Sequence, residues 1–280
     1  MPFPKVALLL AALGLALAAV PFGPARGQDN LQRLLAADLP RRDGVITLHH
    51  SPSADPQAAL YGAEISAAVE WFRARLAWER HLVVAVLDSD DYRRITPIPY
   101  PTPHAEGLTA LIIIADHVVA HPGFDRWDLD EVAVNAAWSF HEIGHVIARD
   151  VGIASGNAWI DELVASTFMA AYVRAECPQF AGFQGGMPPR FSLTGRASTL
   201  AEFDTRYFSI GQWDYLWFHF HFARIADFMA RGADVHSLAE GFRREFPAAA
   251  RRREAIAQTF ERLERISPGV TAFAGPIALP

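Results

Sequence analysis

The residues best suited to chemistry in this chain form the pentapeptide His141-Glu142-Ile143-Gly144-His145. An α-helix has about 3.6 residues per turn, so side chains four positions apart leave the same face. The imidazoles of His141 and His145 can therefore bind one metal ion. Glu142 lies beside them and offers a carboxylate that can accept a proton. The pentapeptide predicts a metal site with an adjacent general base.

The surrounding sequence places this pentapeptide inside a buried helix from about residue 130 to 150. Residues 131–140 contain neither proline nor glycine, and the aspartates at 128 and 130 are suited to cap a helix start. Apolar positions and both histidines follow steps of three and four residues: Val134, Ala137, Trp138, His141, His145 and Ala148. The imidazoles are thus expected on the inward face of the helix.

Cysteine usage excludes a thiolate-rich structural metal site. A structural zinc site usually has four protein ligands, whereas a catalytic one has three and leaves a position open. Cys177 is the only cysteine, so the third ligand is expected to be His, Asp or Glu from a later element. Glu162 is the candidate, because it lies in a second apolar-periodic helix after the loop 152–157. A carboxylate in such a core helix is costly unless a cation compensates it.

These residues resemble the gluzincin metallopeptidases, the superfamily of thermolysin and the M1 aminopeptidase-like enzymes. In that superfamily, His-Glu-x-x-His is followed on the next helix by a ligating Glu. The segment Trp159-Ile160-Asp161-Glu162-Leu163-Val164-Ala165-Ser166 resembles the Trp-Leu-Asn-Glu-Gly-Phe-Ala-Ser segment of the M1-like branch. There are 16 residues between His145 and Glu162. The resemblance implies one Zn²⁺ ion held by His141, His145 and Glu162.

Two other branches of zinc peptidases fit less well. Metzincins carry a third histidine in the register His-x-x-Gly-x-x-His, and no histidine occupies that position here. Thermolysin-like enzymes carry an acidic residue four positions after the ligating Glu, where this chain has Ser166. The M1-like comparison is therefore closer.

The resemblance also implies a tyrosine that donates a hydrogen bond to the developing oxyanion. Tyr207 matches this residue best, although the following glycine comes four residues later instead of three. A neutral phenol suits the role because it does not compete for the metal. Tyr215, His219 and His221 are the competitors. The two histidines lie two residues apart and so point to different faces of the helix. For each of them, a core or interface role is expected. The aromatic stretch 213–222 is expected to pack in the core.

The elements that must position these residues indicate an α+β fold. Buried strands are expected at 44–50, 82–87 and 108–115, with a long helix from Gln57 to Arg80 between the first two. The resemblance implies that the 108–115 strand is an edge strand that aligns an extended peptide substrate. A plain core strand is the alternative, because four consecutive aliphatic residues suit burial on both faces.

The remaining sequence completes the predicted organisation. Further helices are expected near 206–231, 234–246 and 248–266. One domain over residues 28–280 would then comprise an α/β lobe, the zinc-site helices and a helical lobe, at 28–125, 126–176 and 177–280.

The N-terminus predicts export. Lys5 precedes an apolar run from Val6 to Val20 that is short for a bilayer span, and small residues follow at Ala25 and Gly27. A signal peptide over residues 1–27 is expected, with an uncleaved anchor as the alternative. The mature protein would then be secreted or periplasmic and carry no stable membrane span.

The charge of the chain argues against a nucleic-acid partner. The formal net charge is −6, and Lys5 is the only lysine. An acidic protein without a basic stripe binds nucleic acid poorly. The run Arg251 to Arg253 is offset by nearby glutamates and is expected on a solvated helix face.

Taken together, the residues predict an exported zinc peptidase whose partner is a peptide or protein substrate. Zinc would polarise water and the scissile carbonyl, while Glu142 would take the water proton and pass it to the leaving amine. Asp161, Ser166 or a backbone carbonyl would orient an imidazole. One alternative is an aminopeptidase, although the Gly-x-Met-Glu-Asn motif of the M1-like branch is absent. The other is a non-catalytic exported zinc-binding scaffold.

Overall fold

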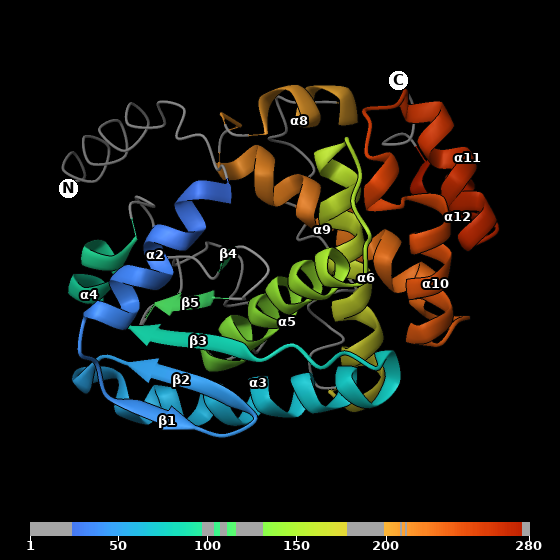
Figure 1. The fold of residues 1–280 in the computed structure, drawn as a ribbon. Coiled ribbons are helices and arrows are strands. Elements are labelled where there is room, and N and C mark those ends of the chain that lie inside the picture. The colour runs from blue at the N-terminus through green and yellow to red at the C-terminus, as the bar shows by residue number, and fades with distance from the viewer. Residues whose placement is uncertain are drawn as a thin grey trace, which may run out of the picture.

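A mixed β-sheet forms one end of the molecule and helices form the other (Figure 1). The computed structural model describes residues 24–96, 104–106, 111–115, 131–177, 199–207, 209–210 and 212–275. Within these residues the architecture is α+β, as predicted. The predicted signal peptide lies outside this part of the chain except for residues 24–27.

The sheet has the order β1-β2-β3-β5-β4 among the described strands. These strands are β1 (Arg41–Asp43), β2 (Ile46–His50), β3 (Leu82–Leu87), β4 (His104–Glu106) and β5 (Leu111–Ala115). The three central strands are parallel, whereas β1 and β4 pair antiparallel at the two edges. The edge position predicted for 108–115 is wrong: β4 pairs with the outer side of β5, so β5 is an inner strand, and residues 108–110 lie outside the described part.

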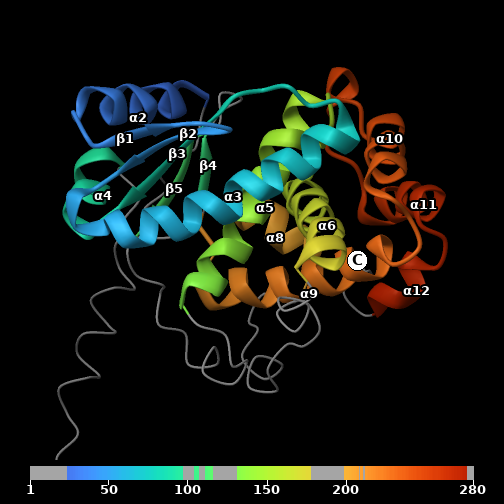
Figure 2. The same cartoon turned by 90° about the horizontal axis from the view of Figure 1, so that it is seen from below.

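Helices cover both faces of the sheet (Figure 2). Side chains alternate along β3, so Val84 and Val86 join the main core with α3 (Asp55–Leu76), while Ala85 and Leu87 face the opposite way. That second face is covered by α2 (Pro24–Ala36) and α4 (Ser89–Ile95). α4 begins directly after β3, where the carboxylate of Asp88 accepts hydrogen bonds from the first turn of the helix.

The two helices that carry the predicted metal site cross in the middle of the molecule (Figure 1). They are α5 (Glu131–Asp150) and α6 (Ala158–Glu176), and their bounds agree with the sequence prediction. Their backbones touch at Gly144, where an added Cβ would lie 2.6 Å from the carbonyl oxygen of Ala165. Only glycine permits this approach, which brings the pentapeptide next to the turn of α6 that carries Glu162.

The C-terminal region packs against α6 and α3. Its helices are α8 (Leu200–Arg206), α9 (Gln212–Ala230), α10 (Val235–Glu245), α11 (Ile256–Ile266) and α12 (Val270–Ala274). The bounds of α10 agree with the prediction within one residue. The helix predicted at 206–231 corresponds to α9, which begins later, at Gln212; the sequence did not predict α8, which ends at Arg206.

The helix predicted at 248–266 starts later, at Ile256. A 3₁₀ turn spans Ala248–Ala250, and residues 251–255 are not helical because they cross the start of α6. There the backbone N–H of Gly156 donates to the carbonyl of Arg252 at 3.1 Å, and an added Cβ on Gly156 would lie 2.0 Å from the Arg252 backbone. The arginine run is therefore not on a helix face: Arg251 donates to the carbonyl of Ser155.

One large hydrophobic cluster runs from the inner face of the sheet through α3, α5 and α6 to α9, α10 and α11. The predicted site residues lie within this buried region: His141, Glu142, His145 and Glu162. Among the described residues, none of the helices combines the length and the apolar character needed to cross a membrane.

Candidate metal centre

Three imidazoles converge on one carboxylate oxygen. The Nε2 atoms of His141, His219 and His145 lie 3.1, 3.3 and 3.4 Å from Oε2 of Glu162. α5 supplies the first and last of these histidines, α6 supplies Glu162, and α9 supplies His219. Glu162 is only 2% exposed. Because ligand atoms of His141, Glu162 and His219 all lie within 4.8 Å of one another, this buried group can hold a metal ion.

The structure brings the three predicted ligands near one another, but the group that can hold a metal ion comprises His141, Glu162 and His219 and does not include His145. His141, His145 and Glu162 meet as the helix spacing requires. His219 is buried, as a core role predicts, but its Nε2 also faces Glu162. His221, two residues on, contacts the ring of Trp217 at 4.2 Å between centroids. The two histidines thus do point to different faces, and only His219 reaches the site.

The arrangement fits a cation on its own chemistry. Nε2 of His219 is buried and has no hydrogen-bond partner within the described residues, although it lies close to the Glu162 carboxylate. A buried polar atom without a partner is costly, and a cation between imidazoles and a carboxylate would compensate it.

Ser166 orients one of the imidazoles. Its Oγ lies 3.2 Å from Nδ1 of His141, one turn of α6 beyond Glu162. When Nδ1–H donates to this hydroxyl, Nε2 is the nitrogen left for a metal. Ser166 was one of the residues expected in this role. Asp161 was also expected to orient an imidazole, but it accepts a hydrogen bond from the backbone N–H of Ser155 at 2.9 Å instead.

Tyr207 reaches the site from the end of α8. Its hydroxyl donates a hydrogen bond to Oε1 of Glu162, the oxygen that the imidazoles do not face. The sequence predicted that Tyr207 acts on the oxyanion of the substrate. In the structure the hydroxyl supports the carboxylate of Glu162.

The ionisable groups in the centre shift one another's pKa values. Burial acts to raise the pKa of Glu162, but the imidazoles of His145 and His141 outweigh it and hold this pKa well below its ordinary value. Burial acts to lower the pKa of His145, and the Glu162 carboxylate outweighs it and raises this pKa. Burial and the same carboxylate raise the pKa of Tyr207, so the phenol stays protonated and can donate. Burial lowers the pKa of His219 to about 3, which leaves a neutral imidazole suited to bind metal.

Glu142 contacts the edge of the sheet. Its Oε2 accepts a hydrogen bond from the backbone N–H of Ala105 at 2.7 Å. Ala105 is the middle residue of β4, and the ring of the preceding His104 lies against Tyr92 instead. The sequence prediction missed β4, because three residues are too few to show strand periodicity. The carboxylate beside the imidazoles is therefore also beside a strand edge.

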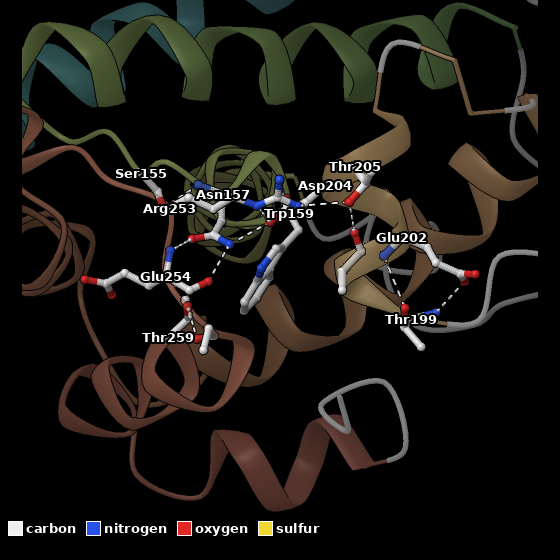
Figure 3. Close-up of polar contacts among 12 residues, drawn as sticks. Ser155, Asn157, Trp159, Thr199, Glu202, Asp204, Thr205, Arg253, Glu254 and Thr259 are labelled. Atoms are coloured by element: carbon white, nitrogen blue, oxygen red, sulfur yellow. Dashed lines mark hydrogen bonds and ion pairs between the residues drawn. The ribbon is translucent and has the colours of Figure 1, made fainter.

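A polar network docks α8 onto the start of α6 (Figure 3). Asp204 of α8 accepts a hydrogen bond from Nδ2 of Asn157 at 2.6 Å and from the backbone N–H of Trp159 at 3.1 Å. Asn157 also binds Glu254, accepting from its N–H and donating to its carbonyl. The first turn of α6 is thus capped by a residue of another helix. Because Tyr207 follows three residues after Asp204, this contact positions its hydroxyl near Glu162.

A small apolar cavity of about 20 Å³ lies behind His141. Its walls include Trp138, His141, Met169, His219, Phe220 and Ala223. This volume admits about one water molecule. The centre is therefore closely packed beside His141.

Comparison of the chain with protein-family models, with curated proteins and with solved structures finds no match.

Proposed function

We propose that this protein is an exported zinc-dependent peptidase with a gluzincin-like centre. The observation that carries the proposal is the convergence of the imidazoles on Oε2 of Glu162, with Glu142 next to them at a strand edge. Metal-assisted hydrolysis requires a pair of histidines on one helix, a ligating carboxylate from the next helix and a second carboxylate that can act as base, here at a strand edge.

Zinc is the ion that suits these donors best. Imidazole nitrogen and carboxylate oxygen are its ordinary protein ligands, whereas calcium and magnesium favour oxygen alone. His141 and His145 with Glu162 would hold the ion, and Ser166 would fix the orientation of His141. The bound ion would supply a Lewis acid that polarises a carbonyl and a water molecule.

Glu142 is the proposed general base. Its carboxylate is 8% exposed and accepts one N–H from β4, so it can also accept a proton from a water molecule close to the imidazoles. It would then pass this proton to the leaving amine. Tyr207 supports Glu162 in the conformation described, and an oxyanion role would require its hydroxyl to leave that carboxylate.

The edge of β4 favours an extended peptide as the substrate. β4 pairs with β5 on one side, and none of the other described strands pairs with its second side. A peptide laid along an edge strand can form main-chain hydrogen bonds with it. Because the N–H of Ala105 already points to Glu142, a peptide on this edge would present its amide beside the proposed base.

The experiment measures zinc in the purified protein and hydrolysis of a mixed peptide library by the wild type and by Glu142→Gln. We expect about one zinc per chain in both proteins, and turnover in the wild type only. Glu261→Gln, a substitution of an exposed glutamate, is the control for the loss of a carboxylate and should keep wild-type turnover.

The possible outcomes distinguish between the hypotheses for the function of the site. Absence of zinc contradicts the proposal, and bound zinc with an inert wild type favours the non-catalytic scaffold. Peptides with blocked and free N-termini distinguish the two kinds of peptidase, because an aminopeptidase requires the free amine. We expect cleavage of blocked peptides.

A further inference from the structure

His219 has the geometry of a ligand. Its Nε2 faces the same oxygen of Glu162 as the Nε2 atoms of His141 and His145, and its distance of 3.3 Å lies between theirs of 3.1 and 3.4 Å. A hydrogen-bond donor to a substrate would stand further from the ligating carboxylate, because the substrate has to lie between them. The ligand atoms of His219, His141 and Glu162 also lie within 4.8 Å of one another, so His219 belongs to the group that can hold a metal ion.

Packing holds the ring of His219 in this position. The ring lies 4.2 Å from the ring of Tyr215 and 5.5 Å from that of Trp138, between centroids. It is 5.2 Å from the ring of His141 and only 6% exposed. The whole of α9 packs against α6, which carries Glu162. His219 is therefore oriented toward the centre by its own helix and by two aromatic neighbours.

We propose that His219 is a fourth protein ligand of the metal ion, so that the centre is closed once the ion is bound and opens only when His219 withdraws. This inference rests on the metal binding proposed above. A zinc site with four protein ligands has no open position, whereas hydrolysis requires one. His219 would then regulate access, because a substrate can reach the bound ion only at the position that His219 leaves.

The test counts the ligands of zinc directly. X-ray absorption at the zinc edge reports the number of coordinated imidazoles, and a competing chelator reports the Kd for Zn²⁺. Both are measured on the wild type, His219→Ala and His219→Gln, with His221→Ala as the control. His221 is also on α9, and its Nε2 is likewise buried without a hydrogen-bond partner among the described residues. Glutamine keeps most of the volume of His219, in case the alanine variant does not fold.

We expect three imidazoles in the wild type and in His221→Ala, and two in either His219 variant. We also expect both His219 variants to raise the Kd for Zn²⁺ by more than about tenfold. A tenfold loss of affinity is the lower limit expected for a residue that only orients a ligand. Two imidazoles in the wild type, or a Kd in the His219 variants within about tenfold of the wild type, would overturn the inference. A wild type that binds no zinc would reject the proposed function itself, which keeps the two failures distinct.

Discussion

Gly144 of α5 contacts the backbone of Ala165 of α6, and this contact sets the distance between the two helices of the candidate metal centre. An added Cβ would lie 2.6 Å from the carbonyl oxygen and 2.9 Å from Cα of Ala165. Because both atoms belong to the backbone, neither can yield by rotating a side chain. The glycine inside the His-Glu-x-x-His pentapeptide thus has a structural role of its own.

Gly144→Ala is expected to separate α5 from α6. Overpacking of this kind costs about 1–3 kcal/mol of stability, and the shift of α5 should also weaken zinc binding. Chemical denaturation and a zinc titration measure the two effects. Gly232→Ala is the matched control, because nothing lies within 4 Å of a Cβ added there. A Gly144→Ala protein as stable as the control would contradict the close contact.

Tyr207→Phe is expected to weaken zinc binding. The change removes the hydroxyl that donates to Oε1 of Glu162 and keeps the ring that contacts Phe203. Loss of a residue that supports a metal ligand costs about 10–100-fold in affinity. Tyr172→Phe removes the hydroxyl that interacts with Cys177 at the other end of α6 and should not change the Kd. If Tyr207→Phe lowered turnover at unchanged zinc affinity, the hydroxyl would act on the substrate instead.

Asp88→Ala is expected to lower stability in a pH-dependent manner. Hydrogen bonds from the Asp91 backbone and from Ser53 hold the pKa of Asp88 below its ordinary value of 3.8. A depressed carboxylate pKa stabilises the fold above the unfolded-state pKa, and this stabilisation is lost as pH falls through the lower folded-state pKa. Loss of this helix cap should therefore cost about 0.5–2 kcal/mol at pH 7, and the difference from wild type should shrink below pH 3.8. Urea denaturation at both pH values measures it, and a constant difference would contradict the ionic cap.

Periodicity predicted the parts of the site that lie on long helices. The apolar steps through the pentapeptide and through the segment around Glu162 are strong, and α5 and α6 form at the predicted bounds. The spacing of His141 and His145 is a property of one helix, so their meeting follows from the sequence alone. Strand β3 is predicted because it is a continuous apolar run, whereas β2 alternates apolar and polar residues from Ile46 to Leu48.

Contacts between distant segments could not be predicted from the sequence. His219 lies in an aromatic stretch whose composition indicates core packing, and only the crossing of α9 over α6 turns it toward Glu162. β4 has three residues and no alternation to detect. The position of α8, a helix that the sequence did not predict, depends on its docking to α6 through Asp204, a hydrogen bond across 45 residues of sequence. No local pattern specifies such pairings.

That docking leads to the last prediction. Asp204→Ala leaves the donors of Asn157 and Trp159 without their acceptor, which should cost about 1–3 kcal/mol of stability. It should also loosen Tyr207 and so weaken zinc binding through Glu162. If Asp204 acts through Tyr207, the double variant Asp204→Ala, Tyr207→Phe should bind zinc no more weakly than Tyr207→Phe alone. Arg206→Ala, an exposed substitution on the same helix, is the control. Additive losses in zinc affinity would show that Asp204 acts on the centre by another route, through the start of α6.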